Sequence, residues 1–373
     1  MVFDVSAARE ALPSVLSSAY FNAGTFGPLP RSAHEAMLAH ADASFTRGRI
    51  GSAALHGWLD QMQETRACFG RSLRVPPAEL AITHCTTDGI NAVLWGITWQ
   101  PGDEVLTTTH EHPGLTAPLA EVARVHGVSV RAVEPHQVAD EVRKETRLVA
   151  LSHVLWTNGD VLPLPRISAA ARANGPRTQV LVDGAQSTGA ISVDLHASDV
   201  DYYTVSGQKW FCGPSGTGAL WIHPRALDAL GTAWPWYLSK NRFAKPAEAW
   251  TTAQRLDATT LSMTSLAGII GALRFHKEQV DAGALTAAQA RAIDLRAQLS
   301  ALPRVKVIAV ANPSTIVSFT VEGVTDSAAA AQLEAKGILV RNIPGFAYVR
   351  VSVGFWNDAG DVARLVKGVS ELA

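Results

Sequence analysis

Short apolar runs alternate with helix-forming segments through the first 225 residues, and this alternation constrains the fold more than any other feature. The segments between the runs, such as 117–126 and 165–173, are rich in Ala, Leu and Arg and are predicted to be helical. Strands joined by helical crossovers pair in parallel, so we predict an α/β fold with a mainly parallel sheet covered on both faces. The predicted buried strands are 104–109, 147–153, 179–182 and 219–223.

The rest of the chain predicts a second, smaller part of mixed composition. Helical periodicity covers 265–279 and 285–302, and three further strands are expected around a helix at 327–336. The strands of this βαβ-like tail are 305–310, 315–321 and 348–353. We therefore expect a large domain of residues 16–250 and a small domain formed by 1–15 and 251–373.

Composition excludes several classes of protein. The 32 Lys and Arg balance 33 Asp and Glu, whereas a dedicated nucleic-acid binder carries a marked basic excess. Hydrophobic residues make up 47% of the chain, which allows a large core, but the most apolar stretch, 266–273, is too short to span a bilayer. The first residues lack the basic start of a signal peptide. We expect a cytoplasmic protein with no nucleic-acid or membrane partner.

The three cysteines, Cys68, Cys85 and Cys212, show neither CxxC nor Cys/His metal spacing. This number and spacing argue against a disulfide framework and against a zinc site. We therefore expect no metal, and a reducing compartment.

Polar residues follow the predicted strands, where ligands bind in parallel α/β sheets. Asp183 ends one apolar run and either caps a helix or binds a cofactor. Lys209 follows another turn and either extends its amine to solvent or serves as a nucleophile in Schiff-base chemistry.

Two more segments after strands carry polar groups. His110 and His112 are spaced as metal ligands can be, but a ring stacked on a planar ligand, or a buried histidine in the core, fits better without further ligands nearby. Residues 85–89 place hydroxyls at a helix start, which suits an anion or ordinary capping equally.

A Trp-, Lys- and Pro-rich segment, 232–260, has neither helical nor strand periodicity. We interpret it as a long functional loop or domain connection. Its aromatic side chains, at 234, 236, 237 and 250, either form a pocket for the substrate or belong to the core.

Together and in this order, these segments resemble the fold-type I, class V family of pyridoxal 5'-phosphate (PLP) enzymes. That family includes aminotransferases, cysteine desulfurases, isopenicillin-epimerase-like proteins and cysteine or cystine C–S lyases, and the likeness is strongest to the L-cysteine/cystine C–S lyases. The resemblance implies a large domain around a mainly parallel seven-stranded sheet and a smaller α+β C-terminal domain. It rests on YFNAGTFGPLP (20–30), LSHVLWTNGDVLPL (151–164), LVDGAQSTGAISVDL (181–195) and DYYTVSGQKWFCGPSGTGALWIHP (201–224).

The resemblance also implies how the chain would bind PLP. Lys209 would hold the cofactor covalently and shuttle the Cα proton, and Asp183 would pair with the pyridinium nitrogen. His112 would stack on the ring, and Gln186 would donate a hydrogen bond to the phenolic oxygen. The residues implied to bind the phosphate are Thr86, Thr87, Ser206 and Gln208.

Substrate and subunit contacts are implied in the same way. Arg350 would clamp the α-carboxylate of an amino-acid substrate through its bidentate fork. Thr260 would reach the phosphate of the neighbouring subunit, which implies a homodimer with active sites at the subunit interface. The other residues expected to bind substrate are Asn22, Asn158 and Trp236.

The chain departs from the family pattern at two places. The family's Ser-x-His-Lys segment has Gln208 in place of the histidine, so no imidazolium charge is available to the phosphate. Cysteine desulfurases carry a nucleophilic cysteine upstream of the clamp arginine, whereas residues 341–346 contain no thiol. Cys212 follows Lys209 closely and is expected to be buried and structural.

These features favour a PLP-dependent C–S (β-) lyase acting on cysteine, cystine or an S-substituted L-cysteine. The α,β-elimination releases a thiol and aminoacrylate, which hydrolyses to pyruvate and ammonia, and it requires no catalytic thiol. Decarboxylation-coupled oxidative deamination, transamination and epimerisation remain alternatives on the same scaffold. A catalytically silent PLP-fold regulator is disfavoured because Lys209, Asp183 and Arg350 are all present.

Overall fold

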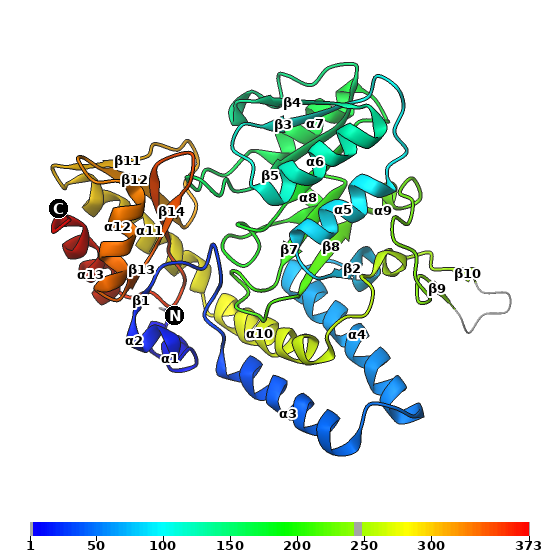
Figure 1. Cartoon of the computed structure of the whole chain (residues 1–373), viewed down its shortest axis with the longest axis horizontal. Helices are drawn as coiled ribbons and strands as arrows, with labels where there is room; N and C mark the ends of the chain where they lie inside the picture. Colours follow the sequence, from blue (N-terminus) through cyan, green and yellow to red (C-terminus); the bar gives the residue numbers. More distant parts are fainter. Residues whose placement is uncertain (1–2, 242–247, 373) are drawn as a thin grey trace.

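The computed structural model describes residues 3–241 and 248–372, which form a large and a small lobe (Figure 1). The large lobe is built on a seven-stranded sheet with the order β2-β8-β7-β6-β5-β3-β4. Only β8 runs antiparallel to its neighbours, so the predicted mainly parallel sheet is confirmed. The strands are β2 (Leu80–Thr83), β3 (Glu104–Thr108), β4 (Ser129–Val133), β5 (Thr146–Ser152), β6 (Gln179–Asp183), β7 (Tyr202–Ser206) and β8 (Gly218–Ile222).

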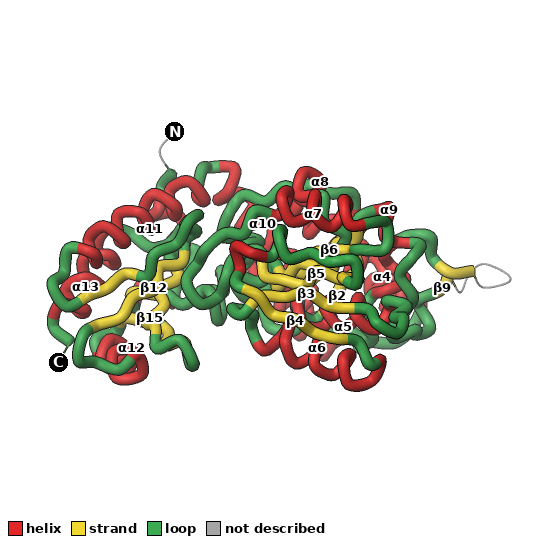
Figure 2. The backbone as a smooth tube through the Cα atoms, turned by 90° about the horizontal axis from the view of Figure 1, so that it is seen from above, coloured by secondary structure: helices red, strands yellow, loops and turns green. Residues whose placement is uncertain are grey.

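Helices cover both faces of this sheet, as Figure 2 shows. Successive residues of the central strands point to opposite faces and enter two separate hydrophobic cores. In β6, for example, Leu181 packs into one core and Val182 into the other. This double burial explains why the strands are continuous apolar runs. The helices are α5 (Thr86–Gly96) and α6 (Pro113–His126) on one face, and α7 (Leu164–Asn174) and α8 (Leu195–Ser198) on the other.

The small lobe contains a four-stranded sheet with the order β11-β12-β15-β14. Both β12 and β14 are antiparallel to β15, so they run parallel to each other with α12 as their crossover. The predicted βαβ-like tail is thus a split βαβ unit with β15 in the gap. Its elements are β11 (Val305–Val307), β12 (Ile316–Val321), α12 (Asp326–Ala335), β14 (Arg341–Ile343), β15 (Tyr348–Ser352) and the packed helices α11 (Ala284–Ser300) and α13 (Ala359–Ser370).

The N-terminal segment associates with the small lobe before the chain enters the large one. β1 (Ala19–Tyr20) pairs in parallel with β13 (Ile338–Leu339). The short helices α1 (Val5–Glu10) and α2 (Ser14–Ser17) precede it. Three long helices, α3 (Arg31–Arg47), α4 (Ser52–Leu73) and α10 (Met263–Asp281), then pack together beside the large sheet, as Figure 1 shows. The predicted domain boundaries remain a prediction.

The aromatic segment 232–260 is largely irregular, with short elements inside it. It contains β9 (Lys240–Asn241), which pairs with β10 (Glu248–Ala249), and the 3-10 turn η3 (Ala253–Leu256). Residues 242–247 of this segment lie outside the described residues.

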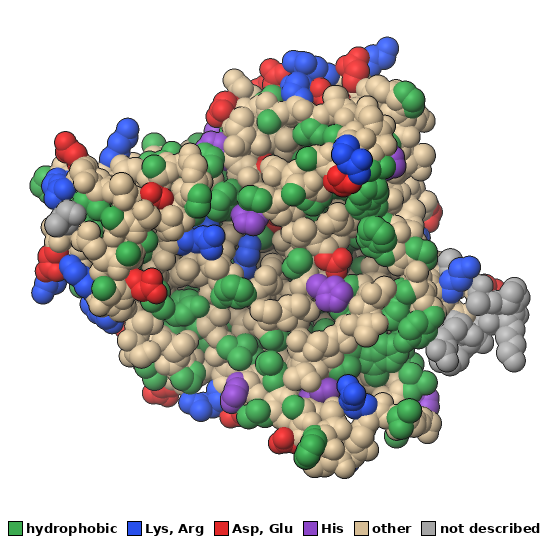
Figure 3. Space-filling model, viewed as in Figure 1, with side chains coloured by type: hydrophobic (Ala, Val, Ile, Leu, Met, Phe, Trp, Pro, Cys, Tyr) green, Lys and Arg blue, Asp and Glu red, His purple; other side chains and the backbone are tan. Residues whose placement is uncertain are grey.

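Charged side chains of both signs are interspersed on the face shown in Figure 3. Along the described part of the chain, no helix is both long enough and apolar enough to cross a membrane.

Candidate active site

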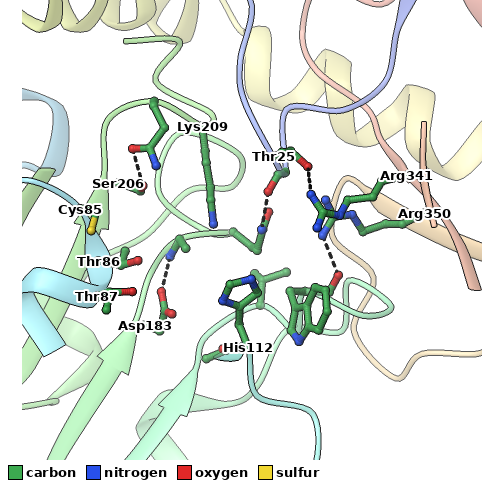
Figure 4. A pocket seen from close by; sticks show the side chains of 17 residues that line it. Thr25, Cys85, Thr86, Thr87, His112, Asp183, Ser206, Lys209, Arg341 and Arg350 are labelled. Carbon is green, nitrogen blue, oxygen red and sulfur yellow. Dashed lines mark hydrogen bonds between the residues drawn. The ribbon is translucent and has the colours of Figure 1, made fainter. Parts of the chain in front are cut away.

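A cavity of about 200 Å³ lies where the carboxyl ends of β5, β6 and β7 meet the small lobe and the segment after β1 (Figure 4). Sheets of this topology bind ligands at this edge. The residues that line the cavity are Gly24, Thr25, Cys85, Thr86, Thr87, His112, Ser152, Val154, Trp156, Asp183, Ala185, Gln186, Ser206, Gln208, Lys209, Arg341 and Arg350.

Lys209 and Asp183 carry opposite charges at the large-lobe side of the cavity. Asp183 is the last residue of β6 and accepts a hydrogen bond from the Ala185 amide at 2.9 Å. Burial raises the pKa of the Asp183 carboxyl, which the nearby Lys209 ammonium opposes. Burial likewise lowers the pKa of Lys209 to about 8, with Asp183 acting in the opposite direction and Arg350 adding to the decrease. A fraction of the amine is therefore neutral and nucleophilic near neutral pH.

His112 stands at the start of α6, where its Nδ1 accepts a hydrogen bond from the Gly114 amide at 2.9 Å. Its ring meets the Trp156 ring edge-on, with centroids 4.9 Å apart. Burial, together with Lys209 and the two arginines Arg341 and Arg350, lowers the pKa of His112 to about 4. The imidazole is thus neutral, a state suited to stacking on a planar ring.

Hydroxyl groups gather where α5 begins, at another wall of the cavity. Thr86 and Thr87 form the first turn of α5, and the preceding Cys85 does not cap the helix with its side chain. Ser206 ends β7, and its hydroxyl donates to Gln208 Oε1 at 2.8 Å. Hydroxyls at an uncapped helix N-terminus make an anion site.

Two arginines form the opposite side of the cavity (Figure 4). Arg341 on β14 and Arg350 on β15 are directly paired across the strands, so their side chains share one face of the small sheet. Arg350 is fully buried, and burial and Arg341 lower its pKa to about 9. Its Nη1 donates to Trp156 O at 3.0 Å, whereas its Nε and Nη2 have no partner. No carboxylate of the described residues pairs with either guanidinium, so this side of the cavity favours an anionic ligand.

Gln186 is engaged differently from its predicted role. Its amide nitrogen donates to Gly24 O at 2.9 Å, and its oxygen accepts from the Trp210 indole at 3.0 Å. One N–H of the amide therefore remains for a ligand. A Cβ at Gly24 would lie 2.7 Å from Arg350 Nη2, so a larger residue there would displace the guanidinium.

Four predicted site residues lie away from the cavity lining of this chain. Trp236 packs edge-on against Trp58. The side chain of Asn158 accepts a hydrogen bond from the Asp160 amide, and that of Asn22 accepts from the Thr25 hydroxyl. Thr260 is exposed, in a left-handed conformation with φ 37°. Their roles in binding remain predictions.

Three residues near the cavity were not identified from the sequence as functional. Arg341 could have been found from the Pro344-Gly345 turn, because a hairpin there pairs it with Arg350. Trp156 lies within the motif at 151–164, but the family resemblance assigns it no role. Glu111 is buried under the cavity, where it accepts hydrogen bonds from Thr108 and Ser152, and no local pattern distinguishes it from a surface carboxylate.

Comparison with known proteins decides the family. The profile of the aminotransferase class-V family matches residues 21–365. The chain belongs to this family. A probable cysteine desulfurase of Pseudomonas aeruginosa is 32% identical, with 77% of this chain and 76% of the relative covered. An isopenicillin N epimerase of Streptomyces clavuligerus is 30% identical, over 56% of this chain and 54% of its own length.

Solved structures of a class-V enzyme confirm the fold-type I architecture. The cystine C–S lyase C-DES, in complex with its reaction product cysteine persulfide, superposes with a TM-score of 0.92 at 32% identity, covering 97% of this chain and 100% of that one. A C-DES variant with glycine covalently linked to its PLP cofactor gives a TM-score of 0.91 at 31% identity, covering 98% and 99%.

The three cysteines of this class-V chain have different surroundings. Cys85 lines the cavity, whereas Cys68 and Cys212 are buried elsewhere. Within the described ranges, no group of three His, Cys, Asp or Glu side chains could hold a metal ion.

Proposed function

We propose that this protein is a PLP-dependent C–S (β-) lyase that acts on cysteine, cystine or an S-substituted L-cysteine and yields pyruvate, ammonia and a thiol or persulfide. The observation that carries the proposal is the polarity of the cavity. A lysine and a buried carboxylate occupy one side, and the other side has two arginines with no acidic partner among the residues that the structure describes. An amino acid bound through its α-amino group to one side presents its carboxylate to the other.

The residues present fit PLP. Lys209 would hold it covalently, Asp183 would face its pyridine nitrogen and His112 would cover one ring face. The hydroxyls at the start of α5, with Ser206 and Gln208, would receive the phosphate. When bound, PLP supplies an electron sink that stabilises negative charge at the substrate Cα.

The chain's own groups supply the rest of the reaction. Arg350 would bind the α-carboxylate and so fix which Cα bond faces the cofactor. Lys209, whose pKa is lowered to about 8 by burial, would take the Cα proton and return to its resting state after the leaving thiolate departs from Cβ. No protein thiol takes part in this sequence.

Arg341 refines the expected substrate. A second guanidinium beside Arg350 suits a ligand with a second carboxylate, as cystine has, better than free cysteine. The aromatic residues expected to enclose a bulky S-substituent do not support that alternative, because neither Trp236 nor its neighbours line the cavity.

Cysteine desulfurase is the second candidate, favoured by the names of several relatives. Such an activity needs a thiol that accepts sulfur. Cys85 alone of the three cysteines lines the cavity, and it lies at the proposed phosphate side rather than beside the arginines. The β14–β15 hairpin, where the family's nucleophile is expected, contains no cysteine. This placement favours elimination over persulfide transfer to the protein.

We further propose a cytoplasmic homodimer. The exposed position of Thr260, far from the cavity lining of its own chain, suits a residue that completes a neighbouring subunit's phosphate site.

The test is product identification with PLP-loaded protein. L-cystine should yield pyruvate, ammonia and a persulfide, and S-alkyl-L-cysteines should yield the thiol. An aldehyde with CO2, a 2-oxo acid with pyridoxamine phosphate, or a racemised amino acid would identify the alternative chemistries. Absence of pyruvate across the panel refutes the lyase. Sulfur on the protein that disappears in Cys85→Ser would instead identify a desulfurase.

A further inference from the structure

Both cavity arginines belong to one small hairpin of the small lobe. β14 has three residues and lies at the edge of its sheet, where it pairs with β15 alone. The turn between the strands, 344–347, contains Gly345 and Ala347 in left-handed conformations. So short an edge strand has few hydrogen bonds of its own to fix its position.

The charges on this hairpin add to that weakness. Arg341 and Arg350 are directly opposite each other, and like charges across paired strands destabilise the pairing. Burial is the main cause of the lowered pKa of Arg350, and the charge of Arg341 lowers it further. Contacts of the hairpin with the rest of the protein therefore help to hold it in its observed position.

The tip of the hairpin makes such a contact with the large lobe. The Phe346 ring packs on the His110 ring, with centroids 4.8 Å apart and planes inclined by 48°. His110 follows β3, two residues before the ring-covering His112. Its Nδ1 lies 2.9 Å from the hydroxyl of Thr157, which is fully buried and holds the imidazole in place.

The same segment of the large lobe also holds the base of the hairpin. Trp156 O accepts from Arg350 Nη1, and Thr157 O accepts from the Ser318 hydroxyl on β12 at 2.7 Å. Trp156 thus supports the hairpin directly at its charged base, whereas Thr157 supports the tip through His110 and contacts β12, the neighbour of β15. At its charged base Arg341 Nη1 also donates to the Thr25 hydroxyl at 3.0 Å, whereas the tip is held by the contact between the Phe346 and His110 rings.

We propose that Phe346 and His110 are positioning residues for substrate recognition: their ring contact fastens the β14–β15 hairpin to the large lobe and so holds Arg341 and Arg350 in place for the substrate carboxylates. The inference rests on the proposed function, in which these arginines bind carboxylates. It assigns a role in binding to two residues that do not line the cavity.

The experiment compares Phe346→Ala with wild-type holoenzyme on two ligands that differ only in their carboxylates, L-cystine and cystamine. Affinities are measured from the absorbance change of the bound cofactor, and KM and kcat from pyruvate release with L-cystine. Phe346→Leu retains an apolar side chain at the tip. Phe45→Ala removes the same atoms from an exposed site on α3 and serves as the control.

Phe346→Ala should weaken L-cystine binding and raise its KM by about tenfold, with kcat within about threefold of wild type and cystamine affinity unchanged. Phe346→Leu should recover most of the loss. His110→Ala should reproduce it, and the double variant should lose no more than either single one. Phe45→Ala should match wild type.

Three outcomes overturn the inference. Wild-type affinity of Phe346→Ala for L-cystine refutes it and leaves the lyase intact. Equal weakening of both ligands, with a lowered melting temperature, identifies a purely structural contact. A wild-type protein that neither binds nor cleaves L-cystine refutes the proposed recognition of cystine and this inference with it.

Discussion

Glu111 offers a sharp test of the electrostatics beneath the cavity. Its carboxylate is buried and accepts hydrogen bonds from the Thr108 hydroxyl at 2.6 Å, the Ser152 hydroxyl at 2.6 Å and the Ser152 amide at 3.0 Å. These bonds stabilise the ionised form, while burial and the nearby Asp183 destabilise it. Burial dominates and raises the pKa of Glu111 from 4.5 to about 7.

The sign of the effect on stability follows from proton binding. An acid whose pKa is raised in the folded state binds its proton more tightly there than in the unfolded chain. Glu111 therefore contributes favourably to the free energy of unfolding. This contribution is complete below pH 4.5, the pKa of the group in the unfolded chain, and is lost as the pH rises through about 7. A shift of this size corresponds to about 3 kcal/mol of unfolding free energy, at 1.36 kcal/mol per pKa unit.

We therefore expect Glu111→Gln to abolish this pH dependence. The neutral amide resembles the protonated carboxyl, so the variant and the wild type should differ little near pH 5. Near pH 8 the free energy of unfolding of the variant should exceed that of the wild type by about 3 kcal/mol, because only the wild type bears the buried charge. Denaturant unfolding followed by tryptophan fluorescence, at matched protein and PLP concentrations, measures the difference at each pH.

Glu121→Gln is the matched control, since Glu121 is exposed on α6 and paired with Arg124. It should leave the pH profile close to that of the wild type. A stability difference between Glu111→Gln and wild type that stays flat from pH 5 to 8, or that turns against the variant, would refute the reasoning. It would show that the hydrogen bonds outweigh burial and keep Glu111 ionised.

Three further substitutions test the cavity itself. Asp183→Asn should lower kcat by about a hundredfold, because it replaces a charged hydrogen bond worth up to about 3 kcal/mol. PLP should remain bound in this variant, which its visible absorbance will show. Arg350→Lys should raise the KM for L-cystine by about tenfold or more through loss of bidentate binding; an unchanged KM would exclude Arg350 as the carboxylate clamp. Gln208→His should tighten PLP binding below the imidazole pKa and not above it, as fluorescence titration at two pH values can establish.

Apart from β2 and β7, which were not predicted although they are buried, the large sheet was predictable where strands are buried on both faces. Such strands are unbroken apolar runs, so β3, β5, β6 and β8 were located to within one or two residues. β4 was not predicted, because it lies at the edge of the sheet and its residues are partly exposed. They include Arg131, which pairs with Glu104. Edge strands lack the double burial that produces the pattern.

The cavity was predictable for residues that directly follow strands. Topology places Asp183, Lys209 and His112 at one edge of the sheet, and an apolar run ending in a polar group marks each. The positions of Arg341 and Glu111 near the cavity depend instead on contacts between segments that are distant in the sequence. Arg341 reaches the cavity through its register with Arg350, and the buried Glu111 accepts hydrogen bonds from Thr108 and from Ser152 of a neighbouring strand.

The motif at 151–164 shows what sequence likeness does not reveal about how the lobes are joined. Its Asn158, whose role in substrate binding remains a prediction, supports a turn through the Asp160 amide. In this turn Gly159 adopts φ 80° and approaches Ile316 O so closely that a Cβ would lie 2.5 Å away. Asp160 then accepts from the Asn312 amide at 2.9 Å, which joins the large lobe to the strand entering the small one. Trp156 and Thr157, in the same stretch, hold Arg350 and β12. The stretch therefore joins the two lobes through hydrogen bonds to the segment before β12, to β12 itself and to Arg350 of β15.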